Sequence, residues 1–418
     1  MNLKAKQLVD LYIGGPLVAL LVLPVRLAGI LLKRKHDLNQ PRHILFIKLL
    51  GGGSLFLALP TIIAIRKKHP QCQISLLCSS AMSGFARSFG IFDHVRVIND
   101  QNLFSLIFSS IKQLLWSMSF TDTTIDLEVH SRLTTIYTTL TLAQNRVGFA
   151  DHNSLWRKRL YTHVIYFNFT NKVFSFYDSI AALFGVKEVL ASQASEHLKK
   201  MIAQNSKIPD SVRSQIPQKP FIALGVGCSL LGKERELSAK NWKTFLQTIR
   251  KKMPDVPFVF LGGKEDSALA SEVAKDFSAS FNFCGQLDIL GSCQILTQAQ
   301  FYIGIDSFLM HMGRALCPRV VGFWGPTQPA TLLRPLPLTE KHFWQNYLCS
   351  PCIHRVVYPP CKGQNECMKH HPLDEAAQFV AENWSKIAQQ NIMYEQGVWA
   401  FYPDIATPRW VDFKTQSQ

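Results

Sequence analysis

The stretch FYIGIDSFLMHMGRALCPRVVGFWGPTQP, residues 301–329, has the pattern of a strand, a helix and a second strand. Residues 301–305 form an apolar run short enough for a buried parallel strand, and residues 319–323 form another. Between them, Asp306 and Ser307 suit the start of a helix, and apolar residues then recur at helical spacing. Open parallel sheets bind ligands at the carboxyl ends of their strands, and a helix N-terminus attracts phosphate. The stretch therefore predicts an anion-binding unit of an α/β fold.

The polar residues of this stretch also carry a resemblance. The pattern D-S-x3-H, followed by a strand and G-P-T-x-P, resembles the nucleotide-sugar signature of glycosyltransferase family 9, the heptosyltransferase family. The family usually has a glycine after the Asp-Ser pair, whereas this chain has Phe308. The alternative is that Asp306 only caps a helix and that His311 is a satisfied buried histidine. The resemblance implies that Asp306, Ser307 and His311 face the donor and that Gly325, Pro326 and Thr327 shape the wall of its pocket.

Length and charge limit the classes of function. The chain of 418 residues is long enough for two or three domains with a large core. Its formal net charge of +16 calls for an anionic partner: nucleic acid, acidic lipid or a sugar-nucleotide diphosphate. No basic run interleaved with aromatics and no nucleic-acid-binding motif occurs, so nucleic acid is not expected. Six cysteines in apolar surroundings are expected to be buried free thiols of a reducing compartment: Cys72, Cys78, Cys228, Cys284, Cys293 and Cys317.

Residues 1–40 are expected to associate with a membrane. An uncharged run, LYIGGPLVALLVLPV, lies between Asp10 and Arg26 and is interrupted by Pro16 and Pro24. Its 15 residues are fewer than the roughly 20 needed to cross a bilayer. No cleavage site follows, so a secretory signal is not expected. The three cations of residues 33–35 favour a helix lying on the cytoplasmic face of an anionic membrane, with packing on the domain as the alternative.

Residues 43–67 predict a strand, a glycine-containing loop and an apolar helix, as in the opening of a Rossmann-like unit. The glycine spacing is not G-x-G-x-x-G, which argues against dinucleotide binding. The segment is similar to the opening of family 9, in which Lys48, Gly53 and the L-A-L-P of residues 57–60 match. Heptosyltransferases place a catalytic aspartate where this chain has Ser54, and a hydroxyl is no base at neutral pH without help. The base must therefore lie elsewhere, or catalysis is lost.

Residues 124–130, TIDLEVH, alternate polar and apolar, so a strand would place Asp126, Glu128 and His130 on one face. The pattern D-x-E-x-x-S-R, with R-V-G-F at 146–149, is similar to a branch of family 9 that also has serine in the first loop. That resemblance makes Glu128 the expected base and His130 the second choice, with a solvated edge-strand face as the alternative. The acceptor is expected to meet Lys48, Gly53, Arg132 and Arg146, together with the aromatic and basic residues of 151–180, for which an ordinary surface is the alternative.

A second Rossmann-like half is expected to begin with a strand over residues 220–226. The resemblance places its loop, with Gly227 and Ser229, near the donor phosphates. Arg235 corresponds to the cation of a K/R-x-W-P motif and is expected to stabilise the leaving group, although Leu237 and Ser238 replace the tryptophan and proline. The strand over residues 256–261 ends in G-G-K-E-D.

Four further cysteines follow one another at the spacing C-x2-C-x8-C-x5-C. This spacing suits a structural zinc site, with free thiols or a disulfide as the alternatives. No other cofactor is expected, because the nucleotide sugar is a substrate. The four residues are Cys349, Cys352, Cys361 and Cys367.

The fold expected from these features is α/β of GT-B type, with two Rossmann-like lobes and the active site in the cleft between them. Residues 41–200 would form the acceptor lobe, residues 201–375 the donor lobe, and residues 376–418 a C-terminal helix and tail. The resemblance implies metal-independent, inverting transfer of heptose or a related sugar from a nucleotide-diphospho-sugar to a lipopolysaccharide core or another surface glycan. Arg235, Lys48 and helix N-termini would hold the diphosphate charge. The enzyme would work at the cytoplasmic face of the inner membrane as a peripheral protein, or in the cytoplasm.

Two other classes of function stay open. One is an epimerase or hydrolase on the same architecture, which would turn over a sugar nucleotide without an acceptor. The other is a non-catalytic sugar-nucleotide binder, a reading that Ser54 supports.

Overall fold

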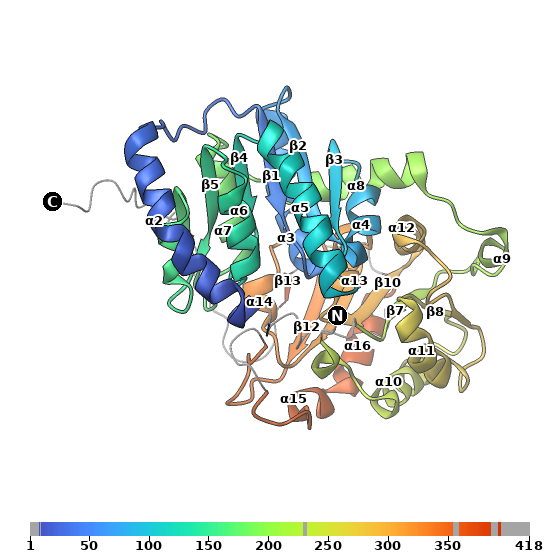
Figure 1. Cartoon of the computed structure of the whole chain (residues 1–418). Coiled ribbons are helices and arrows are strands. Elements are labelled where there is room, and N and C mark those ends of the chain that lie inside the picture. Colours follow the sequence, from blue (N-terminus) through green and yellow to red (C-terminus); the bar gives the residue numbers. More distant parts are fainter. Residues whose placement is uncertain (1–7, 9, 229–231, 354–358, 386–391, 394–418) are drawn as a thin grey trace. The chain divides into compact units, whose positions relative to one another are not determined.

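The computed structural model describes residues 8, 10–228, 232–353, 359–385 and 392–393. The chain divides into two compact units, the first extending to Leu190 and the second starting at Ala191. Each unit is built on one parallel β-sheet with helices packed on it (Figure 1).

The sheet of the first unit has the strand order β3-β2-β1-β4-β5-β6, and every neighbouring pair is parallel. The chain moves outward from β1 to β3 and then returns to place β4 on the other side of β1. Parallel sheets bind ligands where the strand order reverses, which here is the carboxyl ends of β1 and β4. The strands are β1 (His43–Ile47), β2 (Gln73–Ser79), β3 (His94–Ile98), β4 (Thr123–Asp126), β5 (Asn145–Ala150) and β6 (His163–Tyr166).

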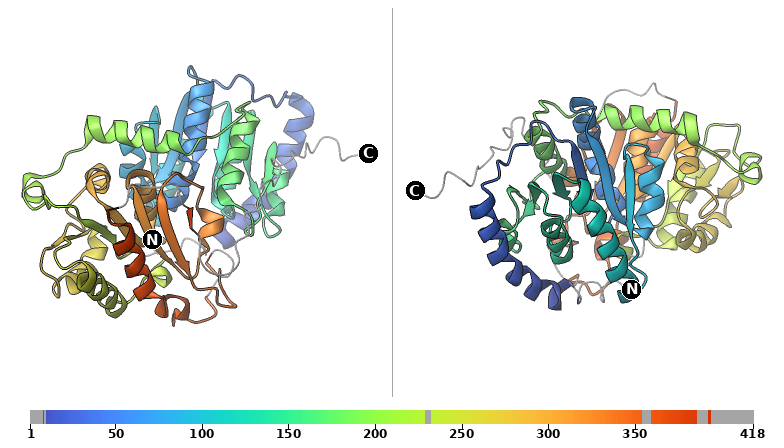
Figure 2. Two further views of the ribbon diagram at one scale, coloured as in Figure 1. Left: turned by 180° about the vertical axis from the view of Figure 1, so that it is seen from behind. Right: turned by 45° about the horizontal axis from the view of Figure 1, so that its top comes forward.

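The same reversal distributes the helices of the first unit over both faces of its sheet, because βαβ crossovers are right-handed. Helices α3 and α7 pack on each other, whereas helix α6 contacts both α2 and α5. Figure 2 shows the sheet from further directions, with helices in front of it and behind it. The helices are α2 (Gly14–Leu32), α3 (Gly52–Lys68), α4 (Ser80–Ser88), α5 (Leu103–Phe120), α6 (Arg132–Leu140), η1 (Leu155–Arg159) and α7 (Val173–Leu183).

The sheet of the second unit has the order β13-β12-β11-β10-β7-β8-β9, again with parallel neighbours. Its strand order reverses between β7 and β10. The strands are β7 (Ile222–Gly225), β8 (Phe258–Phe260), β9 (Ser280–Asn282), β10 (Phe301–Ile305), β11 (Arg319–Trp324), β12 (Thr339–Trp344) and β13 (Ile392–Met393). The helices are α8 (Ser192–Asn205), α9 (Asp210–Arg213), η2 (Lys233–Arg235), α10 (Ala239–Lys252), η3 (Lys264–Asp266), α11 (Ser267–Ala274), α12 (Ile289–Gln298), α13 (Phe308–Leu316), α14 (Pro329–Leu332), α15 (Glu366–Lys369) and α16 (Leu373–Asn383).

Aromatic packing holds β11 in place within the second unit. The ring of Phe323 lies 5.9 Å from that of Trp242 and 5.3 Å from that of Phe245, both on α10. All three side chains are fully buried. Since β11 leads directly into the loop at residues 325–328, this packing also fixes where that loop begins.

The strand–helix–strand unit predicted from residues 301–329 is confirmed as β10, α13 and β11. The six cysteines predicted to be buried free thiols are also confirmed. The division between the units lies ten residues before the predicted one, because α8 contacts α12 and α13 of the second unit. Helix α16 contacts α10 of the second unit, and the tail at residues 394–418 lies outside the described residues.

The N-terminal segment differs from its prediction. The helix runs from Asp10 to Leu32 over 23 residues, so the prolines do not interrupt it. Pro16 falls in the first turn of α2, where a backbone N–H has no intrahelical partner and its loss is tolerated. Pro24 lies inside the helix and does not end it. By length and composition alone, this helix and α5 could each cross a membrane.

Candidate functional site

Asp306 at the end of β10 is the centre of a buried polar group in the second unit. Its Oδ2 accepts a hydrogen bond of 2.7 Å from the Thr327 hydroxyl. The same oxygen accepts a second one of 3.3 Å from Arg235 Nη1. Ser307 occupies the N-cap position of α13, and no side chain there makes a capping bond. The interpretation of Asp306 as only a helix cap is therefore wrong: its carboxylate joins the loop after β11 to the segment that carries Arg235.

Arg235 supplies a cation at this point. Its side chain is mostly buried. Burial by itself would lower the pKa of the guanidinium, but Asp306, together with Cys228 and Glu234, outweighs burial and raises the pKa, so the group stays charged. A buried cation next to the start of a helix, at the reversal point of a parallel sheet, is suited to an anionic ligand.

His311 and Ser307 lie in the same part of α13. Burial lowers the pKa of the His311 imidazole to about 4, against the opposing effect of Asp306, so the ring is neutral at pH 7. The hydroxyl of Ser307 is buried and makes no hydrogen bond of normal geometry within the described part of the chain. Both side chains therefore add polar atoms to this site without adding charge.

Gly325 and Pro326 have a structural explanation of their own. A Cβ on Gly325 would lie 2.5 Å from Met368 Sδ and 2.8 Å from Cys367 Sγ, so only glycine fits against α15. The carbonyl of Pro326 accepts hydrogen bonds from the backbone N–H groups of Cys352 at 3.0 Å and of Ile353 at 3.2 Å. The two residues thus hold the cysteine-containing loop, while Thr327 reaches Asp306. Their predicted role as a wall of the donor pocket stays a prediction.

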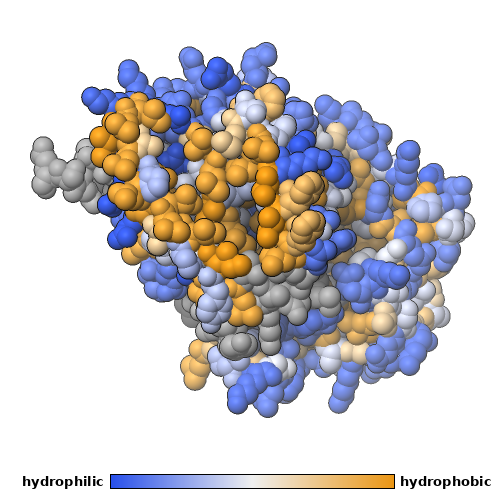
Figure 3. Space-filling model, viewed as in Figure 1, coloured by the Kyte–Doolittle hydropathy of each residue, from blue (hydrophilic) through white to orange (hydrophobic). Residues whose placement is uncertain are grey.

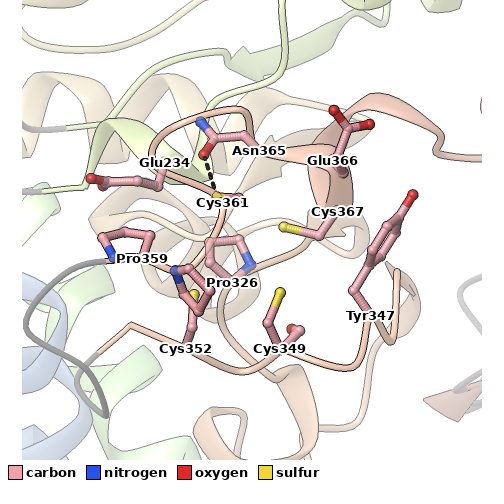
Figure 4. A pocket seen from close by; sticks show the side chains of 12 residues that line it. Glu234, Pro326, Tyr347, Cys349, Cys352, Pro359, Cys361, Asn365, Glu366 and Cys367 are labelled. Atoms are coloured by element: carbon pink, nitrogen blue, oxygen red, sulfur yellow. Dashed lines mark hydrogen bonds between the residues drawn. The ribbon is translucent and has the colours of Figure 1, made fainter.

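The four clustered cysteines line one pocket of about 260 Å³, together with Glu234, Pro326 and Tyr347 (Figure 4). All four are free thiols. Cys361 Sγ lies 3.8 Å from Asn365 Oδ1. Among the residues that the structure describes, no group of three or more His, Cys, Asp or Glu side chains could hold a metal ion. The geometry therefore adds no support to the zinc interpretation of the spacing, which stays a prediction.

Asp266 was not predicted from the sequence as a residue of this site. It is buried beside the ends of β7 and β8, and a Cβ on Gly227 would lie only 2.2 Å from its Oδ1. Its Oδ2 accepts a hydrogen bond of 2.9 Å from Gly263 N. Burial raises the pKa of this carboxyl to about 6. The sequence feature that indicates Asp266 is the G-G-K-E-D motif at the end of the strand predicted over 256–261. Ser229, expected in the same loop as Gly227, lies outside the described residues.

In the first unit, Glu128 binds the loop that follows β1. Its Oε2 accepts a hydrogen bond of 2.8 Å from Lys48 Nζ, and its Oε1 accepts two of 2.9 Å from the backbone N–H groups of Leu49 and Leu50. The strand predicted over 124–130 is wrong beyond Asp126. There the Asp126 carboxylate accepts the N–H of Glu128 and turns the chain out of the sheet. Glu128 and His130 therefore do not share a strand face with Asp126, and Glu128 is not a solvated edge residue either.

The side chain of Arg157 stabilises this turn. It is fully buried and forms an ion pair of 2.5 Å with Asp126. Its Nη1 also donates to the carbonyl oxygens of Glu128 and Val129. Tyr161 is buried with it and donates a hydrogen bond of 2.6 Å to Asp126 Oδ2. The expectation that the basic and aromatic residues of 151–180 meet the acceptor is therefore wrong for Arg157 and Tyr161, because both are buried within the unit.

His130 is an accessible polar side chain of this region. Its side chain is about half exposed, and its ring stacks on that of Phe169 at 5.7 Å. Its Nδ1 lies 3.8 Å from Oδ1 of the buried Asp151. Burial lowers the pKa of the imidazole, with Asp151 acting in the opposite direction. The second oxygen of Asp151 is buried and makes no hydrogen bond among the described residues.

The other residues predicted on the acceptor side have mainly structural contacts. Ser54 donates a hydrogen bond of 2.9 Å to the Gly51 carbonyl, and Gly53 belongs to the first turn of α3. Arg132 lies 3.5 Å from Asp10 and so ties α6 to the N-terminal helix. Arg146 donates to the carbonyl oxygens of Leu160 and Ala143, at 2.8 and 2.9 Å. The structure thus brings together Lys48, Ser54, Glu128 and His130 near the ends of β1 and β4, and it places Arg132 and Arg146 in supporting contacts.

Comparison with known proteins bears on the family and the fold of the chain. The sequence profile of glycosyltransferase family 9 (heptosyltransferase) matches residues 118–361. A family 9 glycosyltransferase from Veillonella parvula has a similar structure, with a TM-score of 0.58 at 15% identity over 74% of this chain and 87% of that one. The E. coli ADP-heptose lps heptosyltransferase II gives 0.58 at 14% identity, over 81% and 96% of the two chains. The E. coli heptosyltransferase WaaC with ADP gives 0.57 at 13% identity, over 82% and 99%.

At these identities the likeness concerns the fold, which is the GT-B type α/β fold predicted from the sequence. No curated protein matches the sequence significantly.

Proposed function

The chain belongs to glycosyltransferase family 9 and is thus a glycosyltransferase that uses a nucleotide sugar; from this premise we propose that it moves heptose or a related sugar onto a lipopolysaccharide core or another surface glycan. The transfer would invert the anomeric centre and need no metal. The observation that carries the proposal is the ion pair between Arg235 and Asp306 at the end of β10. The similar E. coli structure that contains ADP supports a nucleotide-diphospho-sugar as the donor.

This ion pair would stabilise the leaving group of the reaction. When the bond between the sugar and the donor phosphate breaks, negative charge develops on the departing diphosphate, and fixed positive groups stabilise it. Arg235 stays charged because Asp306 raises the pKa of its guanidinium. The N-terminus of α13, which begins two residues after Asp306, adds the positive end of a helix dipole.

The base is the second requirement, because inverting transfer removes a proton from the acceptor hydroxyl. Both oxygens of Glu128 already accept hydrogen bonds, from Lys48 and two backbone N–H groups, so the carboxylate is engaged in holding the loop after β1. His130 has a lowered pKa and is half exposed, so its neutral ring would be able to take up a proton at pH 7. Asp151 would stabilise the imidazolium that forms. We therefore assign the base to His130 and give Glu128 the role of positioning the loop after β1.

The test compares His130→Ala with Glu128→Gln, using ADP-heptose as the donor and a membrane extract lacking the product sugar as the acceptor. His130→Ala should lower turnover by about 10²–10⁴-fold and leave the affinity for ADP unchanged. Glu128→Gln should lower the melting temperature, because Lys48 loses a buried partner, and should reduce turnover less. His152→Ala is the matched control, since His152 is an exposed histidine of the same unit that follows β5.

Two outcomes would change the assignment. Near-normal turnover in His130→Ala, with loss in Glu128→Gln, would return the role of base to Glu128. A wild-type protein that binds ADP but transfers nothing to any surface-glycan extract would favour the non-catalytic reading, which Ser54 at the position of the family's catalytic aspartate makes the second candidate. Turnover of the donor without an acceptor would instead indicate an epimerase or hydrolase.

A further inference from the structure

Helix α5 in the first unit has its apolar side turned outward. Large apolar side chains recur at Phe104, Phe108 and Leu115, which are 80%, 66% and 62% exposed. Positions 104, 108, 111, 115 and 118 lie on one face of a helix. A helix of a globular protein normally turns such a face toward the core. The exposed apolar residues of α5 are Leu103, Phe104, Ile107, Phe108, Ile111, Leu115, Met118 and Phe120.

The inner side of α5 combines apolar residues that pack on the core, Leu106, Leu114 and Trp116, with polar side chains whose hydrogen bonds fix the orientation of the helix. Gln113 accepts a hydrogen bond of 2.7 Å from Arg96 Nε, and Ser117 shares one of 2.8 Å with the buried Tyr137 hydroxyl. The Ser109 hydroxyl accepts the backbone N–H of Asn99 at 2.9 Å. Rotating the helix to bury its apolar side would leave these groups without partners inside the protein, which is costly. The outward apolar face therefore belongs to the folded unit.

Helix α2 presents a second apolar face on the same side of the sheet. It packs on α6 through Gly14, where a Cβ would lie 2.8 Å from Arg132 Cβ, and through the buried Val18. Asp10, four residues before α2, accepts hydrogen bonds from Ser131 and from Leu133 N. Because α6 contacts both α2 and α5, the two helices flank it, and Figure 3 shows their apolar side chains gathered on one side of the molecule. The exposed apolar residues of α2 include Leu17, Leu20, Leu23, Leu27, Ile30, Leu31 and Leu32.

The charges on these helices indicate what kind of partner would cover their apolar faces. Neither α2 nor α5 contains an acidic residue, and their charged residues are Arg26 and Lys112, both exposed. Lys33, Arg34 and Lys35 follow α2 and are exposed as well. Apolar faces carrying only cations complement the negative surface of an anionic bilayer, whereas two copies of this face would bring like charges together.

We propose that α2 and α5 together form one membrane-docking surface, which lies in the interface of a bilayer containing anionic phospholipids. Helix α5 lies in the plane of the membrane, because its inner side is bonded to β3 and α6 along its length. Docking then depends on both the apolar area and the cations. The inference does not require the transfer reaction and is tested without any sugar.

Vesicle flotation tests the surface, with phosphatidylcholine vesicles that either contain or lack phosphatidylglycerol. The full chain should float with the anionic vesicles and much less with the neutral ones. Ile111→Glu with Leu115→Glu on α5, and Leu20→Glu with Leu23→Glu on α2, should each lower the vesicle-bound fraction by about ten-fold or more. Leu190→Glu is the matched control, because Leu190 is an exposed leucine outside both helices. Circular dichroism, and the urea unfolding of the first unit followed by the fluorescence of Trp156, report that each variant is folded.

Three results would overturn the proposal. If the α5 variant floats like the wild type while the α2 variant does not, α5 takes no part in docking. Equal flotation with neutral and anionic vesicles would remove the role of the cations. The third result is a wild-type protein that does not bind vesicles and forms a dimer, together with an α5 variant that is a monomer. That result would identify the surface as an interface between two copies.

Discussion

Asp306 is the residue on which the proposed donor site is expected to depend most, because two hydrogen-bond donors from other segments meet on one of its oxygens. Asp306→Ala removes both hydrogen bonds and leaves Arg235 without its carboxylate. We expect the affinity for ADP, measured by calorimetry, to fall about ten-fold or more, which corresponds to about 1.4 kcal/mol or more. The free energy of unfolding should fall by about 1–3 kcal/mol, because a mostly buried guanidinium loses its partner.

Thr327→Val is the matched control for Asp306. It removes only the hydroxyl that donates to the same oxygen, so it should destabilise the protein by about 1–2 kcal/mol and leave the ion pair with Arg235 in place. ADP affinity should therefore change little. Equal losses of stability in the two variants, with ADP affinity unchanged in both, would show that Asp306 is only structural.

At the scale of elements, a buried cluster joins α13 to β12 and should make the second unit sensitive to acid. Glu340 accepts hydrogen bonds from Arg314 at 2.6 and 2.7 Å and lies 2.7 Å from His342 Nε2. Burial alone would raise the pKa of Glu340, but the charges of Arg314 and His342 outweigh it and lower the pKa from 4.5 to about 2. A folded-state pKa below the unfolded value means that the stabilisation is fully present above about pH 4.5 and is lost as pH falls toward about 2.

Acid titration of stability checks this cluster. The free energy of unfolding of the wild type, followed by tryptophan fluorescence, should decrease steeply between about pH 4.5 and pH 2. Glu340→Gln should lower stability at pH 7 by about 3–5 kcal/mol, because Arg314 remains buried without a counter-charge. The variant should also lose most of the pH dependence within that window. An unchanged slope in the variant would mean that other carboxylates cause the acid sensitivity.

At the scale of the whole molecule, the two compact units should respond differently to ligand. The residues of the proposed donor site all belong to the unit that starts at Ala191. A ligand that binds only the folded form stabilises what it binds, by about 2.7 kcal/mol at a concentration of 100 times its Kd. We therefore expect ADP to shift the urea unfolding of the second unit and to leave that of the first unit in place.

Site-specific tryptophans can separate the two transitions. Trp116 and Trp156 report on the first unit, whereas Trp242 and Trp324 are buried in the second. Replacing Trp116 and Trp156 with phenylalanine leaves a fluorescence signal that comes mainly from the second unit, which also contains Trp344 and Trp384. The difference from the wild type then reports the transition of the first unit. If ADP shifts both transitions together, the units unfold as one cooperative block, and the expectation is wrong.

The sequence by itself determined the elements and the class of this protein. A buried parallel strand is a continuous apolar run and a helix repeats every 3.6 residues, so β10, α13 and β11 could be read locally. Tertiary structure decided the partners. Glu128 and Lys48 are 80 residues apart, and no local pattern shows that the predicted base is bonded to the loop after β1. The apolar period of α5 likewise indicates a helix but not which way it faces. Its orientation is set by the packing of Leu106, Leu114 and Trp116 on the core and by the bonds of Gln113 and Ser117 to other elements.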